Sequence, residues 1–333
     1  MTSYERYQNR LKGEAVDRPP NFDIMMQFAA HWINKPLRQY YLDAKVLVEA
    51  NMAMVEDFEL DIVQAISDPY REAHDLGLKV EFPHDALPLS NIPLIKEPAD
   101  LSKLKYIDPG QGRRMSDRLE AIRLFKESVG GRVPIMGWVE GALAEAADLR
   151  GVGPLMMDLF ERPEWVSELL EFCCEQNIEF ARAQIQAGAD IIGLGDAVAS
   201  QVSPEWYRQY ALPYEQRIFA AVKQSGGCPR LHICGDTTLI LEGMAESGAD
   251  IIDLDWMVDY RRAAELYGTT GPAVCGNFDP VKIMLQGTPE EVKIAVTYCL
   301  EVGGEKNFSC AGCEIPDGTP PENLKAQSEV LNG

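Results

Sequence analysis

The chain has 333 residues, of which 46% are hydrophobic and 25% charged, so it can bury a large core without disulfide staples. Its formal net charge of −21 repels phosphate backbones and anionic lipid surfaces, which argues against a nucleic-acid-binding protein. The polar N-terminus lacks the apolar core of a secretion signal, and no stretch reaches the roughly 18 uninterrupted apolar residues of a membrane span. We therefore expect a cytoplasmic protein without a membrane partner.

Short β-branched runs alternate with amphipathic helical stretches from about residue 60 onward, which is typical of βα units around a parallel sheet. Residues 1–58 predict an N-terminal helical extension, and residues 59–333 predict a (β/α)8 TIM barrel within a single domain. Gly188 and Gly248 support this pattern, because each ends a helical stretch just before a strand. Seven strands are predicted, one short of a closed barrel, at residues 61–67, 133–139, 190–195, 230–234, 250–255, 273–277 and 306–310.

A long stretch, residues 69–130, separates the first two predicted strands. Its prolines indicate an irregular excursion over the barrel mouth, and a small separate subdomain is the alternative. No low-complexity linker divides the chain.

Polar residues that an apolar core would not select follow almost every predicted strand. In a TIM barrel the reactive groups gather at the C-terminal ends of the strands, so these residues are candidates for one common site. Asp279, which precedes Pro280, is explained at least as well as a helix cap. The residues at strand ends are Asp68, Glu140, Asp196, His232, Cys234, Asp255, Asn277, Asp279, Cys310 and Cys313.

His232 and Cys234 form the sharpest element, because residues two apart on a strand face the same side and can bind one ion together. A third soft ligand is expected from Cys310 or Cys313, and Zn²⁺ suits a His/Cys/Cys set. Two alternatives stand beside this one. His-x-Cys alone is more often a structural histidine with a buried cysteine, and Cys310 with Cys313 could form a redox pair.

Three other cysteines are expected to be buried rather than chemically active. Without a secretion signal the eight cysteines are expected to be reduced thiols. Cys173, Cys174 and Cys299 lie within apolar helical patterns, so core packing is the expectation for all three.

An aromatic pocket is a second expectation. Phe22 and Met26 belong to an apolar N-terminal run that could line such a pocket together with Trp138, although packing of a helix explains the run equally well. His31 is a candidate at the barrel mouth, and Asn277 is a further candidate substrate contact. For catalysis the candidates are Glu140, Asp68 and Asp196. Glu140 interrupts an apolar segment, which predicts a buried acid that hydrogen-bonds a phenol or joins the metal shell.

The sequence contains the motifs Ser67-Asp-Pro, Gly188-Ala-Asp, Val202-Ser-Pro, His232-Ile-Cys-Gly-Asp, Ile252-Asp-Leu-Asp-Trp256, Gly276-Asn-Phe-Asp-Pro280 and Gly312-Cys-Glu-Ile-Pro-Asp-Gly-Thr-Pro-Pro-Glu-Asn323. In these motifs the chain resembles the uroporphyrinogen decarboxylase superfamily, and within it the cobamide-dependent methyltransferases. The resemblance covers nearly the whole chain. The closing motif is the most diagnostic. Porphyrinogen decarboxylases have a motif similar to Gly-His-Gly-Ile at the position where this chain, like the zinc methyltransferases, has Gly-Cys.

The resemblance implies particular site residues. It selects Cys313 over Cys310 as the third ligand, with Asp255 as a replaceable fourth. Asp68 matches an active-site aspartate of the decarboxylases. A decarboxylase is nevertheless not expected, because no arginine lies between Arg18 and Arg38, where that activity places an arginine-rich motif for a polyanionic substrate.

The resemblance also implies an activity. We expect a zinc-dependent methyltransferase that moves a methyl group between a small methylated substrate and the cobalt of a corrinoid (cobalamin) carried by a partner protein. An aryl methyl ether such as a methoxyphenol is the expected substrate. The alternatives are methyl transfer from methylcobamide to a thiol such as coenzyme M or to tetrahydrofolate, and a non-catalytic tetrapyrrole- or corrinoid-binding protein with structural zinc. A homodimer is a further expectation.

Overall fold

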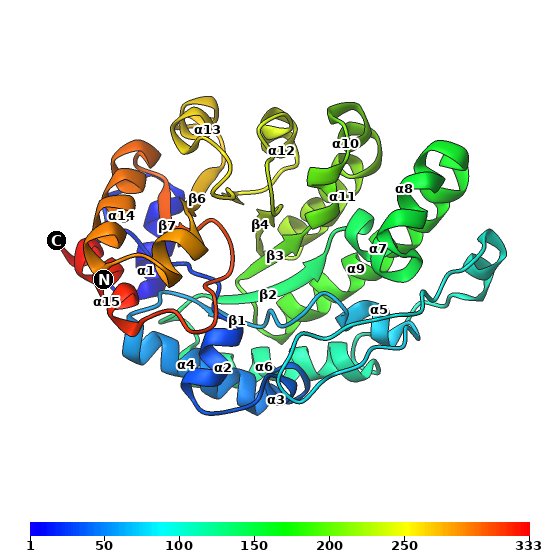
Figure 1. Ribbon diagram of the computed structural model, residues 1–333, viewed down its shortest axis with the longest axis horizontal. Helices are drawn as coiled ribbons and strands as arrows, with labels where there is room; N and C mark the ends of the chain where they lie inside the picture. The colour runs from blue at the N-terminus through cyan, green and yellow to red at the C-terminus, as the bar shows by residue number, and fades with distance from the viewer.

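The computed structural model describes all residues, 1–333. Seven parallel strands form one curled sheet in the order β1 to β7, with helices around its outside (Figure 1). This α/β architecture confirms the predicted fold class, and each strand overlaps its predicted position. The strands are β1 (Val63–Gln64), β2 (Ile135–Glu140), β3 (Ile191–Gly195), β4 (Cys228–His232), β5 (Ile251–Asp253), β6 (Ala273–Phe278) and β7 (Asn307–Ala311).

The eighth position of the barrel is filled by an extended N-terminal segment. The Phe22 amide donates to the Ser309 carbonyl at 2.8 Å, and the Ser309 amide donates to the Pro20 carbonyl at 2.9 Å. On the opposite side, the Asp61 amide donates to the Asn21 carbonyl at 2.9 Å. Residues 20–22 therefore span the gap between β7 and the start of β1, so the N-terminal extension over residues 1–58 contains this extended segment in addition to its helices.

Helices precede, connect and follow the strands, as the βα pattern predicted. The excursion after β1 contains helices at both ends and one short 3₁₀ turn, so only its middle is irregular. Gly188 and Gly248 end helices with φ of 122° and 88°, a backbone conformation that favours glycine. The helices are α1 (Ser3–Leu11), α2 (Gln27–Trp32), α3 (Leu37–Leu42), α4 (Ala44–Phe58), α5 (Arg71–Asp75), η1 (Pro98–Lys103), α6 (Arg113–Val129), α7 (Ala142–Arg150), α8 (Val152–Glu161), α9 (Pro163–Ala187), η2 (Ala197–Gln201), α10 (Pro204–Tyr210), α11 (Leu212–Gln224), α12 (Leu241–Glu246), α13 (Tyr260–Tyr267), η3 (Pro280–Leu285), α14 (Pro289–Gly303) and α15 (Pro321–Asn332).

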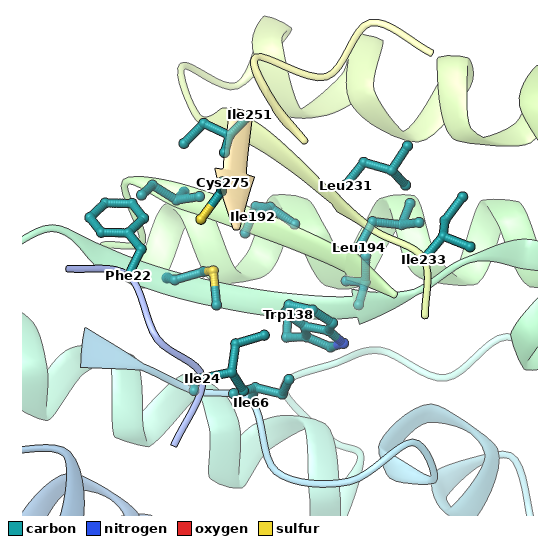
Figure 2. Packing of buried hydrophobic residues seen from close by; sticks show 14 of the residues in the cluster. Phe22, Ile24, Ile66, Trp138, Ile192, Leu194, Leu231, Ile233, Ile251 and Cys275 are labelled. Atoms are coloured by element: carbon teal, nitrogen blue, oxygen red, sulfur yellow. The ribbon is translucent and has the colours of Figure 1, made fainter. Parts of the chain in front are cut away.

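The core has two parts, because alternate residues of a strand face the helices and the barrel interior. Leu231 and Ile233, which flank the interior-facing His232, belong to the buried layer against the helices (Figure 2). The interior below His232 contains a buried ion pair between Arg230 and Asp253, with Nε and Oδ1 2.8 Å apart. This ion pair is part of the floor beneath the strand ends.

Three cysteines confirm the expectation of burial: Cys173, Cys174 and Cys299 all lie in the core. Asp279 caps η3, since its carboxylate accepts from the amides of Val281 and Lys282. No helix combines the length and the apolar composition needed to cross a lipid bilayer.

Candidate active site

Three soft side chains converge at the C-terminal end of the barrel. His232 ends β4, Cys234 follows it two residues later, and Cys313 comes from the loop after β7. The imidazole Nε2 of His232 lies 3.0 Å from Sγ of Cys234 and 3.8 Å from Sγ of Cys313, and the two sulfurs are 3.6 Å apart. All three atoms lie within 4.8 Å of one another, so they could hold one metal ion.

These distances fit a tetrahedral zinc ion. With Zn–S of about 2.3 Å and Zn–N of about 2.0–2.1 Å, neighbouring ligand atoms are roughly 3.5–3.8 Å apart. The two distances to Cys313 fall at this spacing, and only the pair from the same strand is closer. Three protein ligands leave a fourth coordination position, as in catalytic rather than structural zinc sites.

Asp253 orients His232. Its Oδ2 lies 3.2 Å from Nδ1 of His232, and the two residues are directly paired between β4 and β5. Burial alone would raise the pKa of Asp253. The nearby Arg230 and His232 have the larger effect and hold this pKa below its usual value. A carboxylate on Nδ1 leaves the Nε2 lone pair free to face the sulfurs, the usual arrangement behind a metal-bound histidine.

The two thiols differ in acidity. The hydrogen bond from Cys234 and the adjacent imidazole of His232 lower the pKa of Cys313 to about 4. The pKa of Cys234 is raised, because Cys234 is hydrogen-bonded to Cys313 and is largely buried. Cys313 is therefore the thiolate of this pair, the form in which sulfur binds metals.

A cavity of about 230 Å³ opens beside the three side chains. One wall is apolar, and Figure 2 shows Ile24 and Ile66 near the Trp138 ring. The remaining wall carries charged groups. The lining residues are Ile24, Met26, Ile66, Asp68, Pro69, Arg71, Trp138, Glu140, Gly195, Ala197, His232, Cys234, Cys313 and Glu314.

Glu140 and His232 stand on either side of a glycine in one row of the sheet. Glu140 of β2 pairs with Gly195 of β3, which pairs with His232 of β4. A Cβ atom at Gly195 would lie 2.9 Å from the Trp138 ring and 3.3 Å from Oε2 of Glu140. Glycine at this position therefore makes room for the Trp138 ring and the Glu140 carboxyl group, and all three residues line the cavity together with His232.

Arg71 holds Glu140 from the side of α5. A guanidinium nitrogen of Arg71 lies 2.6 Å from Oε1 of Glu140, and the indole Nε1 of Trp138 donates to the same oxygen at 3.3 Å. Burial nevertheless raises the pKa of Glu140 to about 8. Arg71 was not identified from the sequence, since an arginine in a short helix after a strand ordinarily faces solvent.

Two further carboxyl groups line the cavity. Asp68 is ion-paired with Arg114 at 2.5 Å and accepts from the hydroxyl of Ser67, so its carboxylate is already occupied. Glu314 accepts the Gln27 amide at 2.9 Å, and burial raises its pKa to about 7. Glu314 lies within the closing motif but was not singled out from the sequence.

The structure keeps Asp255 and Asn277 out of the cavity wall. The carboxylate of Asp255 accepts the amides of Gly235 at 2.9 Å and Met257 at 3.0 Å, and it is absent from the group of potential ligands. Asn277 donates its amide to the carbonyls of Asp255 and Val258. Both residues hold the loops that carry the site rather than face the cavity.

Three other expected site residues lie elsewhere. Asp196 is fully buried behind the cavity, where it accepts the Ala144 amide at 3.0 Å. Phe22 lies in the barrel wall, 4.7 Å from the Phe308 ring. His31 lies at the surface between Asp85 and Asp317, each 2.8 Å away. Met26 and Trp138, by contrast, do line the cavity.

Comparison with known proteins agrees with the resemblance seen in the motifs. The family model described as Uroporphyrinogen decarboxylase (URO-D) matches residues 2–332. A methylcobamide:CoM methyltransferase, MtbA, of Methanosarcina acetivorans is 36% identical, and the match covers 99% of this chain and 98% of that protein. A uroporphyrinogen decarboxylase of Prochlorococcus marinus is 28% identical over 96% of this chain and 93% of its own.

Solved structures give the same result. A methyltransferase from Methanosarcina mazei superposes with a TM-score of 0.91 at 26% identity, over 99% of this chain and 98% of that one. A B12-independent methionine synthase from Shewanella shares the fold at a TM-score of 0.60 and 15% identity, over 95% of this chain and 98% of its own. The chain therefore belongs to the uroporphyrinogen decarboxylase family, in its branch of corrinoid-dependent methyltransferases.

Proposed function

We propose that this protein transfers a methyl group between the cobalt of a corrinoid carried by a partner protein and the sulfur of a small thiol. His232, Cys234 and Cys313 would hold zinc at the thiol site. The observation that carries the proposal is the spacing of these three ligand atoms, all within 4.8 Å beside a cavity of about 230 Å³.

Zinc at this site would lower the pKa of a thiol that binds to it, and so supply the sulfur in its nucleophilic, deprotonated form. The protein's own residues set up the site. Asp253 fixes the imidazole of His232, and Asp255 holds the amide of Gly235, the residue next to Cys234. Such support keeps ligands in position for a substrate that exchanges at each turnover.

The choice of a thiol rests on the cavity and on the relatives. The relatives called MtbA are named methylcobamide:CoM methyltransferases. The cavity of this chain has one aromatic wall residue, Trp138, because Phe22 packs in the barrel wall. A small, flexible thiol fits this space, and three soft ligands with a fourth open position suit sulfur.

An aryl methyl ether is the second candidate. The apolar side chains of Ile24, Met26, Ile66 and Trp138 favour it, since a methoxyphenol ring would bury apolar surface against them. In that reaction the same metal position would bind the ether oxygen and assist its departure as an anion.

Decarboxylation of a porphyrinogen is disfavoured by the charge of the cavity. The carboxyl groups of Asp68, Glu140 and Glu314 line it, and its one arginine, Arg71, is already ion-paired. A polyanionic substrate would therefore find no free positive charge in the cavity to offset the cost of its desolvation.

The test is a methyl-transfer assay with free methylcobalamin and cob(I)alamin, monitored by their absorbance spectra. We expect demethylation of methylcobalamin by coenzyme M, lost after zinc removal and restored by added zinc. If methoxyphenols methylate cob(I)alamin and thiols do not react, the aryl methyl ether is the substrate and the thiol proposal is wrong. Transfer that persists after complete zinc removal would contradict the proposed site.

A further inference from the structure

We propose that Glu140 accepts the proton that the thiol releases on binding and returns it to solvent after methyl transfer. This inference rests on the proposed function, because it assigns the acid–base partner of the same thiol site. It is carried by the position of Glu140 across the cavity from His232.

The first argument is the row of residues across three strands. Glu140, Gly195 and His232 pair in register on β2, β3 and β4. Because neighbouring strands lie about 4.8 Å apart, the backbones of Glu140 and His232 are roughly 10 Å apart. Both residues line the same cavity, with the Trp138 ring packed over Gly195 in the cavity wall, so a small molecule bound beside His232 shares this cavity with the Glu140 carboxyl group.

The second argument is the free oxygen of the Glu140 carboxyl group. Oε1 receives both Arg71 and the indole N–H of Trp138. Oε2 has no hydrogen-bond partner in the protein, is not fully sealed from solvent, and lies on the side of Gly195, which lines the cavity. A thiol proton could be received at this atom.

The third argument is the charge around Glu140. Glu72 and Arg71 of α5 and Glu145 and Asp148 of α7 surround it, so four carboxyl groups share one guanidinium. Both carboxyl oxygens of Glu145 are buried without a hydrogen-bond partner. Since unpaired buried carboxylates cannot all be ionised, this cluster must hold protons.

The other neighbours do not reverse this charge balance. Asp68, at the end of β1, is neutralised by Arg114, and Asn177 of α9 donates its neutral amide to the Glu140 carbonyl at 2.7 Å. Burial raises the pKa of Glu140 to about 8, close to that of a free thiol at about 8.5. A carboxylate of ordinary pKa would accept a thiol proton far less readily.

The proposed step balances as follows. The S–H bond breaks and its proton goes to Oε2 of Glu140, while the electron pair stays on sulfur. The sulfur then forms a bond to the methyl carbon of methylcobamide. The carbon–cobalt bond breaks, and its electron pair remains on cobalt, which changes from cobalt(III) to cobalt(I).

The experiment measures protons released when coenzyme M binds to the zinc-loaded protein. Isothermal titration calorimetry in two buffers of different ionisation enthalpy gives this number without turnover. At about pH 8 we expect wild type to release about half a proton fewer than Glu140→Gln, because the negative charge of the bound thiolate raises the pKa of Glu140 and the half of these side chains that are ionised before binding then each capture one proton. At about pH 6 both release about one proton, since Glu140 is already protonated.

Glu215→Gln is the matched control, because Glu215 is also fully buried but belongs to α11, outside the cavity. It should release protons as wild type does. The wild-type protein alone tests the inference if Glu140→Gln folds poorly. The number of protons that wild type releases on thiol binding must fall between pH 6 and pH 8 more steeply than ionisation of the free thiol predicts. Equal release by wild type and Glu140→Gln at both pH values would overturn the role of Glu140. Absence of thiol binding to zinc-loaded wild type would instead overturn the proposed function.

Discussion

The backbone of Trp256 passes directly against Gly312, the residue that precedes Cys313. A Cβ atom at Gly312 would lie 2.3 Å from the Trp256 amide nitrogen, a distance that real Cβ atoms essentially never show. The glycine of the Gly-Cys motif thus allows the loop after β7 to approach the loop after β5, and this approach brings Cys313 to His232.

Gly312→Ala should therefore displace the Cys313 loop and weaken zinc binding by at least about tenfold, the effect expected when a ligand loses its support. A competition titration with a chromophoric chelator measures the affinity. Gly153→Ala is the control, because a Cβ atom at Gly153 meets nothing within 4 Å. Unchanged zinc affinity in Gly312→Ala would show that the loop tolerates the added methyl group.

Asp253→Asn tests the support of His232. The variant removes a carboxylate that contacts both His232 and Arg230, so we expect zinc affinity to fall about 10- to 100-fold. Asp250→Asn, near the other end of β5 and partly exposed beside Lys223, should leave the affinity unchanged. Equal zinc affinities of Asp253→Asn and Asp250→Asn would show that Asp253 does not support the metal site.

Cys310 of β7 and Cys313 of the loop that follows it should behave differently. Cys313→Ala is expected to lose zinc, because it removes one of the three ligand atoms. Cys310→Ala should retain zinc, since Cys310 is fully buried in β7 and lies outside the ligand group. Metal analysis after desalting measures both. Zinc loss in Cys310→Ala with retention in Cys313→Ala would reverse the ligand choice.

Asp23 should make stability depend on pH. It closes the seam of the barrel by accepting the Ala311 amide at 2.7 Å, and burial raises its pKa to about 6. A folded-state pKa above the unfolded value of about 3.9 means that the folded protein holds this proton more tightly. Its stabilising contribution is therefore complete below about pH 4 and is lost as the pH rises through 6.

Asp23→Asn should remove this part of the pH dependence, which amounts to about 3 kcal/mol at most. Urea denaturation at a series of pH values between 4 and 7 measures the free energy of unfolding of both proteins. Parallel curves for wild type and variant would contradict the assignment.

Most of the barrel could be predicted because short, largely apolar runs alternate with helical patterns along the chain. The eighth position could not, since the segment around Asn21 contains prolines and is held by a few backbone hydrogen bonds together with side-chain contacts. The carboxylate of Asp61, for example, accepts the Asn21 amide at 2.8 Å. Such pairing leaves no periodic pattern in the sequence.

The site was predictable to different degrees. His232 and Cys234 follow from their spacing on one strand, whereas Cys313 needed the resemblance to a family. The sequence alone favours Asp255 over Asp253 as the acidic residue at the metal site. Which of the two lies beside His232 depends on the register between β4 and β5, and a single sequence does not contain this information. Arg71 and Gly195 could not be identified from the sequence, because their roles depend on contacts with Glu140 and His232, which are distant from them in the chain.

The most direct test of the zinc–thiol site is the X-ray absorption spectrum at the zinc edge of the loaded protein, recorded with and without coenzyme M. We predict two sulfur ligands and one imidazole nitrogen from the protein, and a third sulfur when the thiol is added. A sulfur count that does not change on addition of the thiol would contradict the proposed function.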